Sequence, residues 1–167
     1  MNPMKEIKIE KITLNIGTGE AGNKLAKAMK LLDSITKSKS IATTTKKRIP
    51  TWGIRPGLTI GCKVTLRRKK TELIKNLLIA KENRLKKSNF SAGTVSFGIP
   101  EYIDIPGAEY DADIGIIGLD VSITLQRAGY RVKRRTTQRK QIGKRHQITR
   151  QETMSFFKEK FNINIED

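Results

Sequence analysis

Several stretches of the chain alternate between apolar and polar residues, and this alternation limits the possible fold more than any other feature. Residues 58–67 (LTIGCKVTLR), 94–99 (TVSFGI) and 119–126 (LDVSITLQ) place apolar side chains at every second position. Because successive side chains of a β-strand point to opposite faces, such strands bury one face and expose the other to water. Strands that are covered on both faces are apolar throughout. The pattern therefore predicts an α+β fold, with a mostly antiparallel sheet and helices packed on one face.

The first strand-like segment, residues 7–16 (IKIEKITLNI), changes the phase of its alternation partway along. Its apolar residues occupy odd positions up to Ile9 and even positions from Ile12 onward. A regular strand would turn part of these side chains to the wrong face of the sheet. One extra residue corrects the phase, so we expect a β-bulge near Glu10–Lys11.

Helical periodicity occurs in three places. Residues 23–36 and 71–85 repeat apolar residues at helical spacing, and Asn23 is a candidate N-cap of the first helix. Residues 149–152 (TRQE) form a T-x-x-E capping box, which marks the start of a short helix near the C-terminus. The NINI run at residues 162–165 could add a short edge strand.

The length of 167 residues suits a single domain, which we place at residues 1–167. The chain carries 34 Lys and Arg residues but only 16 Asp and Glu residues, which gives a formal net charge of +18. Such an excess indicates a polyanionic partner, most often nucleic acid. No apolar run is long enough to span a membrane, and the N-terminus lacks the apolar core of a secretory signal. We therefore expect a cytoplasmic protein without a membrane partner.

A single cysteine, Cys62, and a single histidine, His146, limit the chemistry that the chain can perform. One thiol forms no internal disulfide, and neither residue can join a cluster of its own kind. The lone imidazole also gives no credible Ser–His–Asp arrangement. We therefore expect no metal site, no cofactor and no catalytic centre. Cys62 should pack in the core as a small apolar residue, and His146 should face solvent or phosphate.

The charges are sorted into blocks along the chain. Residues 37–70 contain eleven Lys or Arg and no acid, whereas residues 88–126 contain six acids and no Lys or Arg. Residues 127–150 contain ten Lys or Arg, again without an acid. Because crowded like charges repel, this sorting predicts two contacts with a polyanion and an acidic surface turned elsewhere. The second basic block lacks apolar periodicity and should form an extended basic arm at about residues 127–148, with disordered basic segments as the alternative.

Three glycines, Gly17, Gly19 and Gly22, form a G-x-G-x-x-G pattern between the first strand and the first helix. In a dinucleotide site a buried parallel strand precedes the glycines, and an acid about 20 positions later holds the ribose. Here the strand is half polar, and the segment after the helix, KSKSIATTTKKR, is basic. We therefore favour a tight turn that needs glycine for its backbone angles. A nucleotide-dependent enzyme that uses this turn remains an alternative.

The polar face of the LTIGCKVTLR strand combines hydroxyls and cations, among them Lys63, Thr65 and Arg67. Threonines of the preceding segment, residues 43–45, extend a surface that suits phosphates and ribose hydroxyls. Trp52 lies between these segments among lysines and arginines, where an indole can stack on a nucleotide. Burial of Trp52 in the core is the alternative. Because aromatic residues make up only 5% of the chain, recognition should rest on the shape and backbone of RNA.

Several motifs resemble the family of large-subunit ribosomal protein five, and the resemblance covers nearly the whole chain. The most specific is GIRPGLTIGCKVTLR at residues 53–67, and NIGTGEA at residues 15–21 matches an N-x-G-x-G-E-A pattern. FGIPEYIDIPG at residues 97–107 and GLDVSITLQRAGYRVKRR at residues 118–135 are similar to the archaeal type of the family. At Lys37–Ser38 this chain departs from the Gly-Gln that is common in the family.

The resemblance implies a structural, non-enzymatic component of the large ribosomal subunit. It implies helices on one side of a mostly antiparallel sheet, basic loops that extend to RNA, and a place in the central protuberance. The implied partners are 5S rRNA, large-subunit rRNA, peptidyl-site tRNA and a small-subunit ribosomal protein across the subunit bridge. A nonspecific nucleic-acid chaperone is a further alternative.

Charge, polarity and the resemblance together give two sets of candidate site residues. The residues expected to bind rRNA are Asn15, Lys39, Thr43, Thr44, Thr45, Lys63, Thr65, Arg67, Arg68, Arg131, Lys133, Arg134, Arg135, Arg139, Lys140, Lys144 and Arg145. The resemblance implies a second set, in a loop that approaches peptidyl-site tRNA: Lys46, Lys47, Arg48, Trp52, Gly53, Ile54 and Arg55.

Overall fold

The computed structural model describes residues 2–67 and 71–166; Arg68, one of the residues expected to bind rRNA, lies outside these ranges. Within them the chain forms a six-stranded sheet in the order β2-β3-β1-β7-β6-β5, and all neighbouring strands are antiparallel. Its strands are β1 (Lys8–Gly17), β2 (Ile41–Thr44), β3 (Thr59–Leu66), β5 (Phe90–Ser91), β6 (Thr94–Ile99) and β7 (Leu119–Gln126). The helices are α1 (Asn23–Thr36), α2 (Thr71–Ile79), α3 (Arg131–Arg134) and α4 (Arg150–Phe161). Two short strands, β4 (Arg84–Lys86) and β8 (Asn164–Glu166), pair in parallel in a second sheet.

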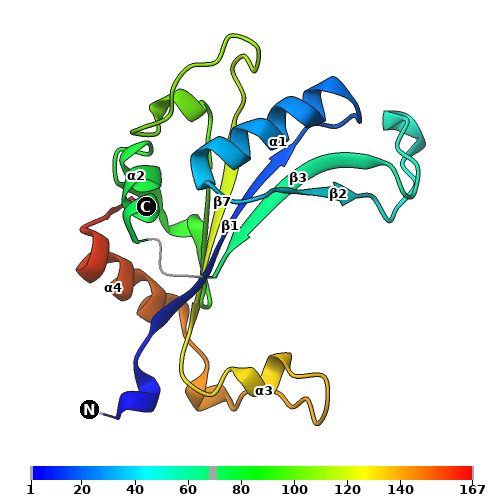
Figure 1. Ribbon diagram of the computed structural model, residues 1–167. Helices are drawn as coiled ribbons and strands as arrows, with labels where there is room; N and C mark the ends of the chain where they lie inside the picture. The colour runs from blue at the N-terminus through cyan, green and yellow to red at the C-terminus, as the bar shows by residue number, and fades with distance from the viewer. Residues whose placement is uncertain (1, 68–70, 167) are drawn as a thin grey trace.

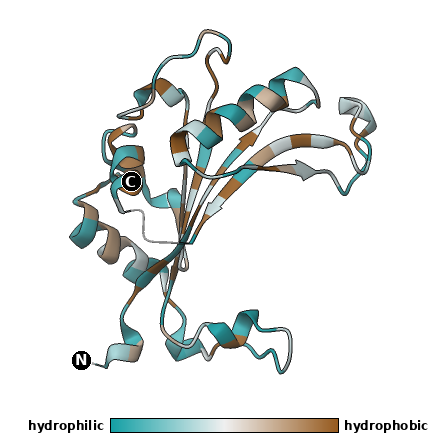
Figure 2. Cartoon of the chain, viewed as in Figure 1, coloured by the Kyte–Doolittle hydropathy of each residue, from teal (hydrophilic) through white to brown (hydrophobic). Residues whose placement is uncertain are grey.

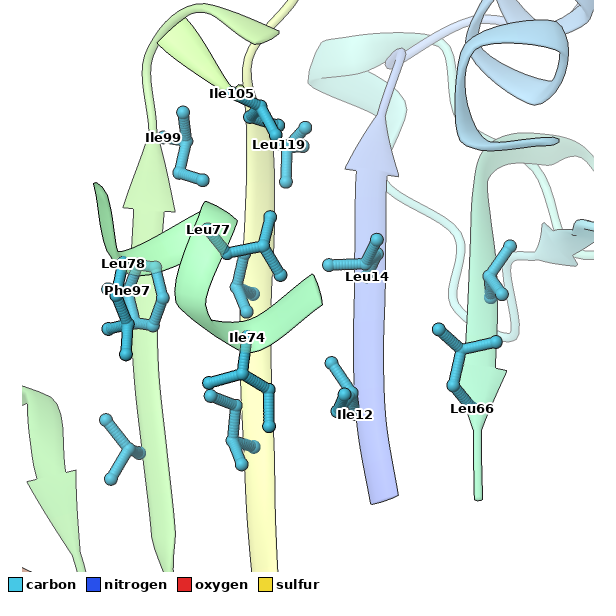
Figure 3. Packing of buried hydrophobic residues seen from close by; sticks show 14 of the residues in the cluster. Ile12, Leu14, Leu66, Ile74, Leu77, Leu78, Phe97, Ile99, Ile105 and Leu119 are labelled. Carbon is cyan, nitrogen blue, oxygen red and sulfur yellow. The ribbon is translucent and has the colours of Figure 1, made fainter. Parts of the chain in front are cut away.

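Helices α1, α2 and α4 pack on the apolar face of the six-stranded sheet, whereas α3 lies in a loop beyond the end of β7 (Figure 1). The strands alternate between apolar and polar residues, as Figure 2 shows. Their inward side chains join those of the three helices in one core cluster. In Figure 3, α2 places Ile74 and Leu77 over the strands and Leu78 beside Phe97 of β6. Each fully buried Leu or Ile contributes about 2 kcal/mol relative to exposure. The predicted α+β class, with helices on one face of an antiparallel sheet, is confirmed.

The predicted bulge in β1 is also confirmed. Ile9 pairs with Leu125 of β7 and Lys11 pairs with Thr124, so Glu10 has no pairing partner of its own. This extra residue restores the phase of the strand, and the apolar side chains on both sides of it pack against the core.

The start of α1 differs from the prediction, because Asn23 is the first helical residue and not the N-cap. Gly22 occupies the cap position with φ of 112° and ψ of −141°, and no side chain caps the helix. Glycine reaches such angles without steric cost, whereas other residues rarely adopt them. The last glycine of the pattern is therefore needed for the turn from strand to helix.

The same turn lacks the geometry of a dinucleotide site. β1 is antiparallel to both of its neighbours, so β1 and α1 are not part of a βαβ unit. The backbone N–H groups of Thr18 and Gly19 donate to the carbonyl oxygen of Ile60, at 2.9 and 3.2 Å. These amides hold the turn to β3 instead of pointing at a phosphate. The alternative interpretation, a nucleotide-dependent enzyme that uses this turn, therefore has no structural support.

Helix α2 is shorter than the predicted helix over residues 71–85. It ends at Ile79, and Glu82 and Asn83 follow in the left-handed conformation, with φ of 53° and 54°. This conformation cannot continue a right-handed helix. Leu85 is buried as expected, but it lies in β4 and pairs with the distant β8. Its spacing fitted a helix, and only its partner from the far end of the chain makes it a strand residue.

The predicted capping box of α4 is confirmed. The Glu152 N–H donates to Thr149 Oγ1 at 3.2 Å, and the Thr149 N–H donates to Glu152 Oε2 at 2.9 Å. Phe157 of this helix is fully buried, with its ring edge-on to Phe90 of β5 at 6.1 Å between centroids. Of the NINI run, Asn164 and Ile165 belong to β8, in the small parallel sheet, whereas Asn162 is the C-cap of α4. Cys62 is fully buried as predicted, and burial raises the pKa of its thiol to about 11.

Candidate nucleic-acid interface

The sheet has a polar face opposite the helices, which we name the open face. The register of the four central strands arranges its side chains in rows that run across the sheet. Its residues are Lys11, Thr13 and Asn15 of β1, Lys63 and Thr65 of β3, Asp120, Ser122 and Thr124 of β7, and Thr94, Ser96 and Gly98 of β6. Hydroxyls dominate this face, and lysines on β1 and β3 give it positive charge.

One row of the open face consists entirely of hydroxyl side chains. Thr65, Thr13, Ser122 and Ser96 follow one another across β3, β1, β7 and β6. The hydroxyls of Ser96 and Ser122 are hydrogen-bonded at 3.2 Å. Hydroxyl groups both donate and accept, so such a row matches ribose hydroxyls and phosphate oxygens. Of this row, sequence reasoning selected only Thr65. Thr13, Ser122 and Ser96 also occupy the polar positions of alternating strands, so the same pattern indicated them.

The structure brings some of the predicted sheet residues together. Asn15 and Lys63 pair directly across β1 and β3. Thr43 of β2 pairs with Gly61, and a Cβ on that glycine would lie 3.1 Å from Thr43 Oγ1, so the hydroxyl lies over bare backbone. Three further predicted residues are exposed at the margin of the sheet: Lys39, Thr44 and Arg67.

The loop between β2 and β3 folds back on itself into a compact tip. Ile49 and Ile54 form an antiparallel bridge across the turn that contains Trp52. The Trp52 side chain is 72% exposed, which rules out its burial in the core. Ile54 is only 5% exposed, and its backbone N–H and C=O are both hydrogen-bonded to Ile49, so it supports the tip from inside. Thr45 uses its hydroxyl within the loop, on the carbonyl oxygen of Arg55 at 2.5 Å. The other residues predicted in this loop are exposed: Lys46, Lys47, Arg48, Gly53 and Arg55.

The basic arm, residues 127–148, is folded and not extended as the sequence suggested. It leaves β7, forms α3 and a 3-10 turn at Lys144–His146, and returns to α4 (Figure 1). The Lys140 N–H donates to the carbonyl oxygen of Val132 at 3.3 Å and so joins the two limbs of the arm. Figure 2 shows that the arm is mostly hydrophilic, so apolar periodicity could not have revealed this fold.

Arg127 anchors the base of the arm. Its guanidinium is buried, and Nη2 donates to Glu152 Oε1 at 2.6 Å. Nη1 donates to the carbonyl oxygens of His146 and Gln147, both at 3.3 Å. Because Glu152 also closes the capping box, one carboxylate joins the arm to the start of α4. Sequence reasoning missed this role, because Arg127 was one more cation in a basic block and its acidic partner lies beyond that block.

His146 also helps to close the base of the arm, where it is half-buried and therefore faces solvent only in part. Its Nε2 lies 2.8 Å from the carbonyl oxygen of Ala128, and its ring meets Tyr130 edge-on at 5.9 Å between centroids. The Tyr130 hydroxyl donates to the carbonyl oxygen of His146 at 3.2 Å and accepts from the Ile148 N–H at 3.1 Å. These contacts use groups from both ends of the arm.

The arm residues predicted to bind rRNA fall into two groups. Arg134 donates to Glu10 at 2.7 Å and to Gln126 at 2.6 Å, and Arg135 Nε donates to the carbonyl oxygen of Gln138 at 2.9 Å. The remaining six are exposed and have no ion pair within the described residues: Arg131, Lys133, Arg139, Lys140, Lys144 and Arg145. The first group shapes the arm, and the second leaves its charge available to a ligand.

A cleft of about 840 Å³ separates the arm from the end of the sheet. The last row of the open face forms one wall, with Lys11, Thr124 and Thr94. The arm forms the other wall, and its cations there are Lys133, Arg134, Arg139 and Lys140. Among the described residues that line the cleft, Glu10 is the only acid, and Arg134 neutralises it. The cleft is therefore a cationic groove that continues the open face, and it suits a phosphate backbone.

The acidic segment, residues 101–113, lies at the other end of β7. It leads into Leu119, whereas the arm follows Gln126, and a strand of this length spans about 25 Å. Asp111 of this segment is held against α1 by Lys30, with 2.8 Å between Oδ2 and Nζ. Their hydrogen bond lowers the pKa of Asp111 and raises the pKa of Lys30. Strand β7 thus separates the acidic segment from the basic arm.

Between residues 2 and 67 and between 71 and 166, no three His, Cys, Asp or Glu side chains lie close enough together to hold a metal ion. Over the same ranges, no helix has both the length and the apolar character that a membrane span requires.

Known proteins match the chain along most of its length. Residues 2–55 match the family model described as Ribosomal protein L5, and residues 59–156 match the model of that ribosomal family's C-terminus. The chain is 47% identical over 166 residues to Large ribosomal subunit protein uL5 of Nanoarchaeum equitans, with 98% of both chains covered. It is 48% identical over 168 residues to the protein of the same name from Sulfurisphaera tokodaii, with 99% of this chain and 95% of the relative covered. It is 46% identical over 168 residues to the uL5 of Methanosphaera stadtmanae, with 99% of this chain and 100% of the relative covered.

Proposed function

This chain belongs to the ribosomal protein L5 family, and we propose that it joins 5S rRNA to large-subunit rRNA in the central protuberance of the ribosome. It is a structural constituent of the large subunit and not an enzyme, and its relatives are of the archaeal type that the sequence motifs indicated. Its working environment is therefore the ribosome in the cytoplasm, in association with rRNA.

One observation carries the proposal: free cations and hydroxyls form a continuous surface from the open face into the arm cleft. Lys63 and Thr65 belong to the first part, and Lys133, Arg139 and Lys140 to the second. Cations bind phosphates without regard to sequence, and hydroxyls bind ribose, so the surface fits a folded RNA. We assign the open face to 5S rRNA and the arm cleft to large-subunit rRNA, because this surface has two parts, one on the sheet and one walled by the arm.

Two further partners are proposed for the loops. The tip of the β2–β3 loop carries Trp52 among exposed cations, a combination that suits contact with peptidyl-site tRNA. The acidic segment repels RNA and attracts a basic protein, because Glu101, Glu109 and Asp113 are exposed on it. We therefore assign the small-subunit ribosomal protein of the subunit bridge to that segment.

Competition between 5S rRNA and unrelated RNA of equal length tests the main proposal. We expect 5S rRNA to displace a labelled 5S probe at a concentration about tenfold or more below that of the unrelated RNA. Binding should also weaken steeply as salt rises, because each neutralised phosphate releases counterions. Arg67→Ala should weaken binding to every RNA by a similar factor. Equal displacement by both RNAs would favour a nonspecific chaperone and contradict the proposal.

Trp52→Ala tests the tRNA contact. The exposed indole contributes little to the core, so the free energy of unfolding should change by less than about 0.5 kcal/mol. Loss of one base-stacking contact should weaken peptidyl-site tRNA binding to subunits that carry the variant by about 10- to 100-fold. Trp52→Phe keeps an aromatic ring and should retain most of the affinity. Wild-type tRNA binding by the alanine variant would remove the indole from this contact.

A further inference from the structure

Asp120 is an unexpected residue on a surface that binds a polyanion. It lies on the open face in β7, and its side chain is exposed. Within the described residues its carboxylate has no ion pair or hydrogen bond, whereas Glu10, the acid at the end of this face, is paired with Arg134. A free carboxylate repels phosphate, so it weakens RNA binding unless the RNA donates a hydrogen bond to it.

The neighbours of Asp120 form a short row with complementary chemistry. Asn15 pairs with Asp120 across β1 and β7, and with Lys63 across β1 and β3. Side chains directly opposite each other have Cβ atoms about 5 Å apart. The side chains of Lys63, Asn15 and Asp120 therefore start in a row about 10 Å long, which is the size of one nucleotide.

Glycines leave room for a base beside this row. The residue opposite Asp120 on β6 is Gly98, and a Cβ there would lie 3.5 Å from Asp120 Oδ1. The carboxylate thus leans over a position without a side chain. Gly17 and Gly118 line the same hollow, which has a volume of about 540 Å³ and is also lined by Asn15 and Asp120.

The hydrogen-bonding capacity of a carboxylate selects among the bases. An ionised carboxylate only accepts, and its two oxygens can accept two parallel bonds. Guanine presents two adjacent donors, N1–H and the N2 amino group, on its Watson–Crick edge. On that edge, the amino groups of adenine and cytosine lie beside a ring nitrogen that accepts, so one carboxylate oxygen would face another acceptor. Guanine therefore satisfies both oxygens of Asp120.

We propose that the row of Lys63, Asn15 and Asp120 reads an unpaired guanine of 5S rRNA, with Asp120 accepting from its N1–H and N2 amino group. The guanine must be unpaired, because its Watson–Crick edge is used by the protein. Lys63 lies at the far end of the row and binds the phosphate, and Asn15 between them holds the sugar or the base. This inference rests on the proposed function, since it adds base recognition to the surface assigned to 5S rRNA.

Asp120→Asn tests the proposal through the sign of its effect. If the carboxylate only repelled phosphate, loss of its charge would tighten RNA binding. We expect the opposite, a loss of about 10- to 100-fold in affinity for 5S rRNA, because the amide places a donor against a donor. The salt dependence should stay the same, since no phosphate contact is removed. Asp104→Asn is the matched control: it removes an exposed acid from the acidic segment and should leave the affinity unchanged or slightly higher.

Inosine substitution identifies the base. Inosine lacks only the N2 amino group of guanosine, so each unpaired guanosine of 5S rRNA can be replaced in turn. We expect one replacement to weaken wild-type binding about tenfold and to have no further effect on Asp120→Asn. Equal or tighter binding of 5S rRNA by Asp120→Asn, with a wild-type melting temperature, would overturn the inference and leave the proposed function standing. Failure of the wild-type protein to prefer 5S rRNA would instead overturn the proposed function.

Discussion

Replacement of Lys133, Arg139 and Lys140 by glutamine is expected to lower the affinity for large-subunit rRNA by about 10²- to 10³-fold at 0.1 M salt. These side chains line the arm cleft and form no ion pair within the described residues, so their charge is available to phosphates. Each lost phosphate contact reduces the slope of log K against log salt by about 0.9, and three contacts reduce it by about 2.7. Filter binding to transcribed large-subunit rRNA over a salt series measures both quantities.

A charge-matched triple variant is the control for this experiment. Lys75 of α2, Lys86 of β4 and Lys158 of α4 are exposed outside the open face and the arm. Their replacement by glutamine removes the same net charge, but we expect it to change the slope by less than one phosphate contact. Equal effects of both variants would mean that net charge, and not the cleft, controls binding. Melting temperatures should stay close to wild type, because all six side chains are exposed.

Glu152→Ala is expected to lower the free energy of unfolding by about 2–4 kcal/mol. The substitution removes half of the capping box and leaves the buried guanidinium of Arg127 without its carboxylate. Breaking a buried ion pair costs about 3–5 kcal/mol, but the Glu152 side chain is 40% exposed, so solvent screening reduces the loss. Urea unfolding gives the value. Glu159→Ala, an exposed acid on the same helix, should change it by less than about 0.5 kcal/mol.

The same carboxylate should make stability depend on pH in the acidic range. Hydrogen bonding from the Thr149 backbone N–H, with a further contribution from Arg127, lowers the pKa of Glu152 below its ordinary value of 4.5. A lowered pKa in the folded state means that this stabilisation is complete above about pH 4.5 and is lost as the pH falls through the folded-state pKa. The difference in stability between wild type and Glu152→Ala should therefore shrink below pH 4.5. A difference that stayed constant down to pH 2 would contradict the role of the ionised form.

Patterns between neighbouring residues predicted the strands, the bulge in β1 and the start of α4. The alternation in β3, β6 and β7 identified the buried face, and the change of phase at Glu10 located the bulge. The capping box of α4 could be read from Thr149 and Glu152 alone. These features were visible because each depends on the spacing of neighbouring residues along one element.

Features that depend on distant partners were missed or misread. Leu85 fitted the helix before it, and only its pairing with β8 makes it part of a strand. Arg127 and His146 belonged to a block that looked uniformly basic, yet one is buried against Glu152 and the other bonds to Ala128. The sequence gives the charge of these side chains, but whether that charge is free or paired depends on residues from another element.

The sequence by itself determined a two-faced antiparallel sheet, a large positive charge held in two blocks, and membership of a ribosomal protein family. Periodicity and composition are properties of a single strand, a single helix or a segment. They can be read from the sequence without knowing which other elements that segment packs against. Only the tertiary structure decided which cations stay free, how the arm folds over a cleft, and that Lys63, Asn15 and Asp120 share one row. Register between strands fixes such a row, and register is set by packing across the whole sheet.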